Sequence, residues 1–245
     1  QIAFFTVGLV LMGAGWGATQ PLTKVAVSTG YGPFGLLFWQ LVVGAALMGA
    51  ICVVKRLPLP MARRALRLYF ILAMIGAVLP NTISYMAAVH LPAGIMSLLL
   101  SVIPMFAFLI ALAIGNEGFQ WRRVIGLGLG LIGVLIIIAP SVDLGLDIPV
   151  IWAALYLVTA AFYAFEGNYI AKWGTEGLDL FQVMFGASLA GALVVTPVMI
   201  GTGQFITPLM PMPAPQLALL ASCVIHILVY SAYVWMAGAA GAVFA

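Results

Sequence analysis

The sequence predicts an all-α integral membrane protein, an inverted repeat of two five-helix units in a ten-span architecture whose ninth span is where this chain ends. Three observations predict it. Hydrophobic residues make up 65% of the 245 residues and charged residues 6%, where soluble domains have roughly 45–50% and 25%. The apolar residues form long continuous runs. The chain also matches itself weakly at an offset of 147 residues.

The composition excludes several classes of protein. Six acidic and nine basic residues cannot give a 245-residue globule the polar surface that solubility needs. A soluble enzyme, a nucleic-acid-binding protein and a disordered tail are therefore excluded, and the lipid bilayer is the expected surrounding. Cys52 and Cys223 lie inside apolar runs without a CxxC or Cys/His spacing, so neither a metal site nor a disulfide is expected. The first apolar run has no basic region before it, so it is interpreted as a span and not a signal peptide.

Eight segments are long enough to cross the membrane, and a ninth begins at about Gly238. A helix that crosses about 30 Å of hydrocarbon needs roughly 20 mostly apolar residues. The runs are continuous rather than alternating, which favours helices over a transmembrane β-barrel. The eight predicted spans cover residues 4–25, 34–54, 68–89, 93–115, 121–140, 150–171, 181–203 and 216–236.

The basic residues predict the orientation. Eight of the nine fall in the loops after even-numbered spans: Lys55, Arg56, Arg63, Arg64, Arg67, Arg122, Arg123 and Lys172. The opposite loops carry only Lys24, at a helix end, with Asp143 and Asp147. Because cytoplasmic loops carry an excess of Lys and Arg, the N-terminus is expected in the cytoplasm.

The self-match divides the chain into a first unit, residues 1–146, and a second, residues 147–245. At the offset of 147 residues, Trp16-Gly17 aligns with Tyr163-Ala164, Phe38 with Phe185, Gly44-Ala45 with Gly191-Ala192, Ser84 with Ser231 and Ala93-Gly94 with Ala240-Gly241. A five-span unit makes consecutive copies enter the membrane in opposite directions. Inverted repeats of this kind are found in many secondary transporters, which hold substrate between the halves. The second unit is expected to be incomplete, since its fourth and fifth spans would extend beyond Ala245.

An ordered set of small and polar residues resembles the EamA-type members of the drug/metabolite transporter superfamily. The residues that carry the resemblance are Trp16-Gly17 and Lys24 in the first span, then Gly76, Asn81, Tyr85, Ala87-Ala88, Pro92-Ala93-Gly94, Ser97, Pro104, Glu117, Gly126 and Gly133. One departure is in the second span, where family members often have an Arg and this chain has Trp39-Gln40. The resemblance implies ten helices around a central cavity, in a protein of the bacterial inner membrane. It further implies transport of small metabolites, often amino acids moved outward.

Glu166 is the most informative polar residue inside a span, because ionisable groups in hydrocarbon normally face a cavity or one another. Its carboxyl group could carry a proton or pair with a substrate amine. The alternative is a structural partner for a neighbouring helix. Lys24 has two interpretations also: a cation at the cavity mouth, or a side chain that reaches the interface.

An aromatic face is predicted on the eighth span, where His226, Tyr230 and Tyr233 are spaced i, i+4, i+7. Such a face suits amphipathic substrates, although His226 could instead join two helices by a hydrogen bond. The complete set of predicted cavity residues is Trp16, Gln20, Lys24, Asn81, Tyr85, Ser97, Tyr163, Glu166, His226 and Tyr230.

Three functional classes remain at this stage. A secondary transporter working by alternating access is favoured, because it explains the repeat. An intramembrane lipid-modifying enzyme would need clustered catalytic residues, and the acids here are scattered; no catalytic residue is therefore assigned. A channel would need rings of like side chains from an oligomer. The sequence contains no P-loop, cofactor or metal motif. Proton coupling through Glu166 and His226 stays open. The glycines at 126 and 130 form a helix-packing motif that is compatible with a monomer or a homodimer.

Overall fold

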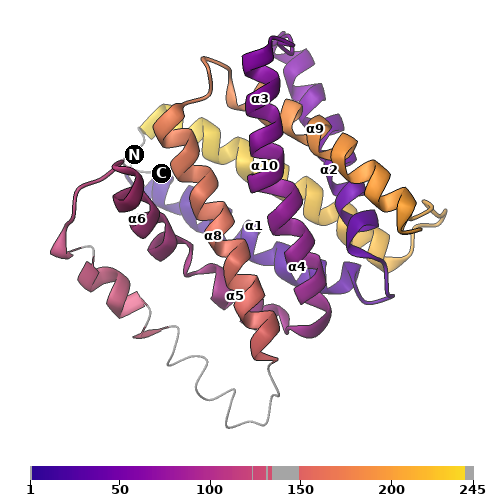
Figure 1. The fold of residues 1–245 in the computed structure, drawn as a ribbon, viewed down its shortest axis with the longest axis horizontal. Coiled ribbons are helices and arrows are strands. Elements are labelled where there is room, and N and C mark those ends of the chain that lie inside the picture. The colour runs from indigo at the N-terminus through magenta and orange to yellow at the C-terminus, as the bar shows by residue number, and fades with distance from the viewer. Residues whose placement is uncertain (1, 123, 131, 134–148, 241–245) are drawn as a thin grey trace.

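The computed structural model describes residues 2–122, 124–130, 132–133 and 149–240, and all regular structure in these ranges is helical (Figure 1). Within them, six helical stretches are long and apolar enough to cross a membrane. These stretches are Pro33–Val54, Arg63–His90, Ala93–Ile114, Val150–Trp173, Leu180–Gly201 and Ala214–Ala232. The predicted all-α membrane class is confirmed.

The first two helices follow the predicted spans closely. Helix α1 (Ile2–Ala26) corresponds to predicted span 4–25, and α2 (Pro33–Val54) to 34–54. Proline at the start of α2 is favourable, because its fixed φ suits the first helical turn and its missing N–H has no partner to lose there. The predicted fifth span lies only partly within the described residues. Of the ninth, predicted to begin at about Gly238, only residues 238–240 are described, and they continue α10 without the predicted break after residue 236.

The third span is a single column of helix in three parts. Helix α3 (Arg63–Leu72) leads into a π-helical turn, η1 (Ala73–Val78), and then into α4 (Leu79–His90). The column begins ahead of the predicted residue 68, because hydropathy marks only the part that lies in hydrocarbon and the helix continues past its edge.

The fourth span is divided into α5 (Ala93–Leu100) and α6 (Ile103–Ile114). Pro104 lies in the first turn of α6. A proline ring clashes with the carbonyl four residues before it, which here belongs to Leu100, the last residue of α5. Pro104 therefore explains why the predicted continuous span 93–115 is interrupted at residues 101–102.

The predicted second unit contains α8 (Val150–Trp173), α9 (Leu180–Gly201) and α10 (Ala214–Ala240). Helix α9 begins with a capping box, in which the Asp179 side chain accepts from the backbone and the Gln182 side chain reaches back to the Asp179 N–H. Both ends of α9 lie 147 residues after the corresponding ends of α2.

Helices α2 and α9 pack against each other in opposite directions. The Gln204 side chain, in the loop after α9, accepts a hydrogen bond of 3.0 Å from the backbone N–H of Phe34 at the start of α2. At the other end, the Gln182 side chain at the start of α9 donates to the Pro58 carbonyl in the loop after α2. Each helix therefore begins where the other ends.

Two of the glycines at which this pair approaches closely are related by the repeat. A Cβ atom on Gly44 would lie 3.3 Å from Ser188 Oγ, and one on Gly191 would lie 3.2 Å from Leu41 Cδ1. Gly191 and Ser188 lie 147 residues after Gly44 and Leu41, respectively. The same contact is thus made twice, with the two helices exchanged.

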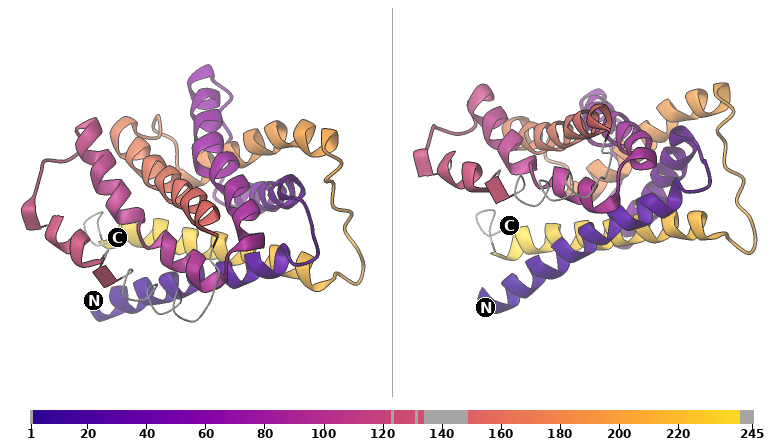
Figure 2. Two further views of the ribbon diagram at one scale, coloured as in Figure 1. Left: turned by 60° about the horizontal axis from the view of Figure 1, so that its bottom comes forward. Right: turned by 90° about the horizontal axis from the view of Figure 1, so that it is seen from below.

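Helices α10 and α4 pack against α2, and α3 packs against α9. Helix α1 packs along α10, and these two lie side by side along the lower edge of Figure 2, left. Helix α8 packs against α4 on one side and α6 on the other. The largest core cluster joins α2 and α4 to Tyr156 of α8, Val195 of α9 and Leu219 of α10.

Candidate functional site

Three tyrosine hydroxyl groups each donate a hydrogen bond to an amide oxygen on another helix. Tyr163 of α8 donates to Asn81 Oδ1 of α4 at 2.9 Å. Tyr156 of α8 donates to Gln20 Oε1 of α1 at 2.9 Å. Tyr85 of α4 donates to Gln40 Oε1 of α2 at 2.7 Å. The three bonds connect four helices in the middle of the bundle.

Helix α8 supplies much of this polar layer from one face. Tyr156, Thr159 and Tyr163 are spaced i, i+3, i+7, so they share a face. The Thr159 hydroxyl is fully buried and donates to the Pro80 carbonyl at 3.2 Å. This hydrogen bond joins α8 to the first turn of α4.

Glu166 lies one turn beyond Tyr163 on α8 and is half-buried. Its carboxyl group lies against Gly76 in the π-helical turn, since a Cβ atom on Gly76 would overlap with the Glu166 carboxyl group, the nearest atom being Oε1. Within the described part of the chain, no hydrogen bond or salt bridge to this carboxylate is recorded. A carboxylate in this position has free acceptor sites for an ammonium group or a proton.

An aromatic cluster lies where α1 meets α10. The ring of His226 is 6.4 Å from that of Trp16 and 6.5 Å from that of Tyr230, with an angle of 11° between the planes in the second pair. His226 and Trp16 both keep exposed surface. The side chain of Tyr233, predicted on the same face, lies outside the described residues.

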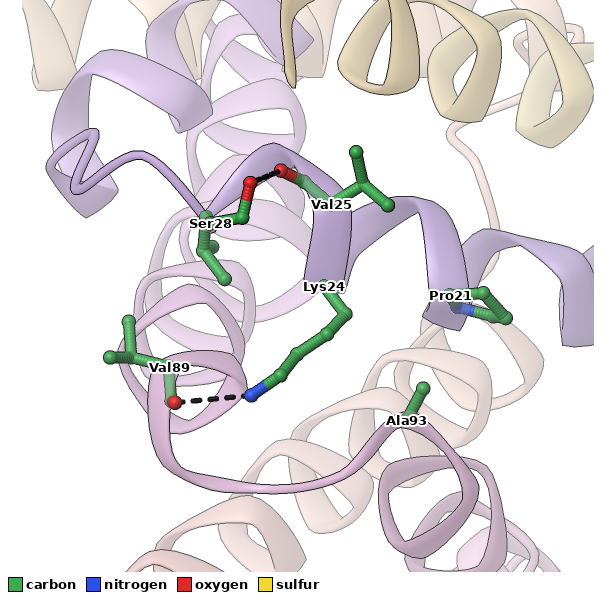
Figure 3. Close-up of a pocket in the computed structure, with 7 residues that line it drawn as sticks. Pro21, Lys24, Val25, Ser28, Val89 and Ala93 are labelled. Carbon is green, nitrogen blue, oxygen red and sulfur yellow. Dashed lines mark hydrogen bonds between the residues drawn. The ribbon is translucent and has the colours of Figure 1, made fainter. Parts of the chain in front are cut away.

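Lys24 lies at the end of α1 in a pocket of about 500 Å³ (Figure 3). Its ammonium group donates to the carbonyl oxygens of Ala88 at 2.7 Å and Val89 at 3.1 Å. These carbonyls belong to the last turn of α4, where helical partners are lacking and a positive charge is favourable. Figure 3 shows the side chain extending from α1 towards the Val89 carbonyl, with Ala93, the first residue of α5, on the other side of the pocket.

Among the described residues, Ser97 makes no hydrogen bond to the polar layer, the aromatic cluster or Lys24. Its side chain is exposed, and its hydroxyl donates to the Ala93 carbonyl of its own helix at 3.1 Å. Its place in the cavity stays a prediction. The same holds for the functional roles of the other predicted residues, which the structure brings together in three groups: the polar layer, the aromatic cluster and the Lys24 pocket.

The family comparison decides what kind of protein carries this arrangement. Residues 4–139 match the EamA-like transporter family. The chain belongs to this family. It is also similar to an uncharacterized transporter, YdfC, of Bacillus subtilis (strain 168), with 25% identity over 176 residues. That match covers 70% of this chain and 56% of the relative, so the chain spans about half the length of the relative that it matches.

Membership of the EamA family confirms the resemblance to the drug/metabolite transporters and the prediction of a multi-pass membrane protein. Two residues of the polar layer were not predicted from the sequence. Tyr156 lies seven residues before Tyr163, and this heptad spacing is a signal that could have found it. Gln40 lies in the second span, and its amide oxygen accepts the hydrogen bond from Tyr85.

A second polar group in this EamA protein connects the two units at the predicted cytoplasmic side. The Asn116 amide, after α6, donates to the Asn168 carbonyl of α8 at 3.0 Å, and the Asn168 amide donates to the Ala107 carbonyl of α6 at 3.0 Å. Lys172 at the end of α8 donates to the Ile114 carbonyl at the end of α6. These bonds close the contact between a helix of the first unit and a helix of the second.

Proposed function

We propose that the full-length protein is a secondary transporter that moves small metabolites outward across the bacterial inner membrane by alternating access. Amino acids or related amphipathic compounds are the proposed substrates. The observation that carries the mechanism is the repeated contact between α2 and α9, Gly44 with Ser188 and Gly191 with Leu41. It supports a pseudo-two-fold relation between residues 1–146 and 147–245.

A pseudo-two-fold relation favours alternating access for a physical reason. When two similar units are inserted in opposite directions, exchanging their conformations turns an inward-facing protein into an outward-facing one of nearly equal free energy. Polar contacts between the units exist near both ends. Gln204 holds the start of α2, and Asn116 holds α8. In the proposed cycle these two contacts break in alternate steps.

The groups in the bundle suit an amphipathic substrate. The Glu166 carboxylate would accept an ammonium group or a proton. Tyr163, one turn before Glu166 on α8, and its partner Asn81 supply neutral hydrogen-bonding groups. Trp16 and His226 offer an aromatic surface for an apolar part of the molecule. Lys24 would meet a substrate carboxylate at the outer end of the path, in exchange for the α4 carbonyls.

Flux measurements on the full-length protein in liposomes test the proposal. We expect saturable uptake of at least one compound from a panel of amino acids and amphipathic metabolites, and stimulation of that uptake by unlabelled compound inside the vesicles. Such counterflow is the signature of alternating access. Unsaturable flux would indicate a channel, and no flux across the whole panel would contradict the proposed transport.

A further inference from the structure

The π-helical turn in the third span has a local cause. Pro80 lies at the second position of α4, and its ring clashes with the carbonyl of residue 76 in a regular α-helix. The chain avoids this clash by widening the turn over Ala73–Val78, so that the Leu79 N–H bonds to the Met74 carbonyl five residues before it. π-helical turns of this kind are frequent at functional sites.

Gly76 lies in the middle of that widened turn and faces Glu166. A Cβ atom on Gly76 would lie at distances no real Cβ shows from three atoms of the Glu166 carboxyl group, which are Oε1, Cδ and Oε2, the last at 2.8 Å. The three atoms nearest to such a Cβ therefore all belong to the Glu166 carboxyl group. The carboxyl group therefore occupies the volume that any larger residue at position 76 would need.

The backbone of α8 cannot easily move away to relieve such a clash. Thr159 and Tyr163 bind it to α4 through Pro80 and Asn81. Asn168 binds it to α6 on the other side of Glu166. Since α8 is held both before and after Glu166, a side chain at position 76 would displace the carboxyl group rather than the helix.

We propose that Gly76 is a positioning residue for Glu166: the glycine leaves a notch in the π-helical turn that holds the carboxyl group where it meets the transported substrate. The proposal rests on the proposed transport function and deepens it. Gly76 and Glu166 form a pair matched in size. With one methyl group more at position 76, the Glu166 carboxyl group must turn away from the notch, whereas an acidic side chain one methylene shorter avoids this overlap.

A set of size-exchanged variants of the full-length protein tests this pairing. Gly76→Ala should raise KM for the transported compound at least about tenfold, because a misplacement of about 1 Å in a site can cost that much or more. Glu166→Asp alone should also raise KM. The double variant Gly76→Ala with Glu166→Asp should recover most of the wild-type KM. Gly94→Ala is the matched control, because a Cβ there meets nothing within 4 Å.

Two further comparisons separate positioning from simple packing. Gly76→Ala with Glu166→Asn has the same volume as the rescued variant but no charge, and it should not recover KM. If it recovers KM equally, the contact is only steric and the positioning role is overturned. A Gly76→Ala variant with wild-type KM overturns the proposal directly.

Thermal unfolding of the same variants decides the contact without reference to transport. Ala usually stabilises a helix relative to Gly, so a lower midpoint for Gly76→Ala, restored by Glu166→Asp, supports the pairing. Independent effects of the two substitutions overturn it. Absence of flux in the wild-type protein would count against the proposed function alone, because the unfolding measurement still decides the pairing.

Discussion

Gly44 of α2 lies directly against Ser188 of α9, so closely that a Cβ atom on the glycine would be 3.9 Å from the Ser188 Cβ. This contact lies between the two predicted units, in the helix pair whose members run in opposite directions. Disulfides have Cβ atoms about 3.5–4.5 Å apart. The geometry at this point therefore allows a covalent test of the proposed mechanism.

Gly44→Cys with Ser188→Cys should form a disulfide under mild oxidation, in a background where Cys52 and Cys223 are replaced by Ala. Because the bond would join the two units, transport should stop on oxidation and return after reduction. After proteolytic cleavage between the two units, the disulfide is detected on a non-reducing gel, where the two fragments migrate together. The single variant Gly44→Cys is the control. Efficient cross-linking with unchanged transport would contradict movement between α2 and α9.

Glu166→Gln removes the negative charge of the carboxyl group that faces Gly76 and leaves the volume of the side chain nearly unchanged. A hydrogen bond to a charged group contributes about 1.5–3 kcal/mol, so KM for an amine substrate should rise at least about tenfold. If the carboxyl group also carries the coupled proton, the variant's transport rate should no longer depend on pH. Glu176→Gln, in an exposed loop, is the control. An unchanged pH profile in Glu166→Gln would exclude this carboxyl as the proton carrier.

Tyr163→Phe removes the donor to Asn81 and leaves the amide oxygen without this bond. The loss should lower the free energy of unfolding by about 1 kcal/mol, seen as a lower thermal midpoint in detergent. Tyr169→Phe is a matched control on the same helix, since Tyr169 makes ring contacts with Phe165 and Trp173. Equal midpoints for the two variants would show that the Asn81 bond adds little stability.

Lys24→Met keeps the apolar length of the side chain but removes the ammonium group that binds the end of α4. We expect a loss of about 1 kcal/mol in stability, because two carbonyls lose a charged donor that lies at the edge of the bundle. If Lys24 also meets a substrate carboxylate, KM should rise for amino acids and stay constant for the corresponding amines. A parallel change for both substrates would assign Lys24 a structural role only.

The predicted orientation can be measured by cysteine labelling in the same cysteine-free background. A membrane-impermeant maleimide applied to intact cells should label Thr29→Cys, in the exposed loop after α1, without permeabilisation. Met61→Cys, in the exposed loop after α2, should be labelled only after permeabilisation. The reverse pattern would place the N-terminus outside the cytoplasm and contradict the prediction from the basic residues.

The sequence predicted a large part of this architecture because hydropathy measures transfer into lipid, which acts on each segment separately. The helices α1, α2, α8 and α9 therefore lie close to their predicted spans. Polar residues inside those spans, among them Asn81, Tyr163 and Glu166, could be recognised for the same reason: their cost in hydrocarbon implies a partner or a cavity.

Transfer into lipid is the same for every face of a helix, so it does not say which helices are neighbours. Only the tertiary structure decided that Tyr163 meets Asn81, that Tyr156 and Gln40 belong to the polar layer, and that Ser97 bonds its own helix. Packing in the bilayer depends on shape and on small residues. That is why the notch at Gly76 and the paired glycines of α2 and α9 became visible only when the helices were placed together.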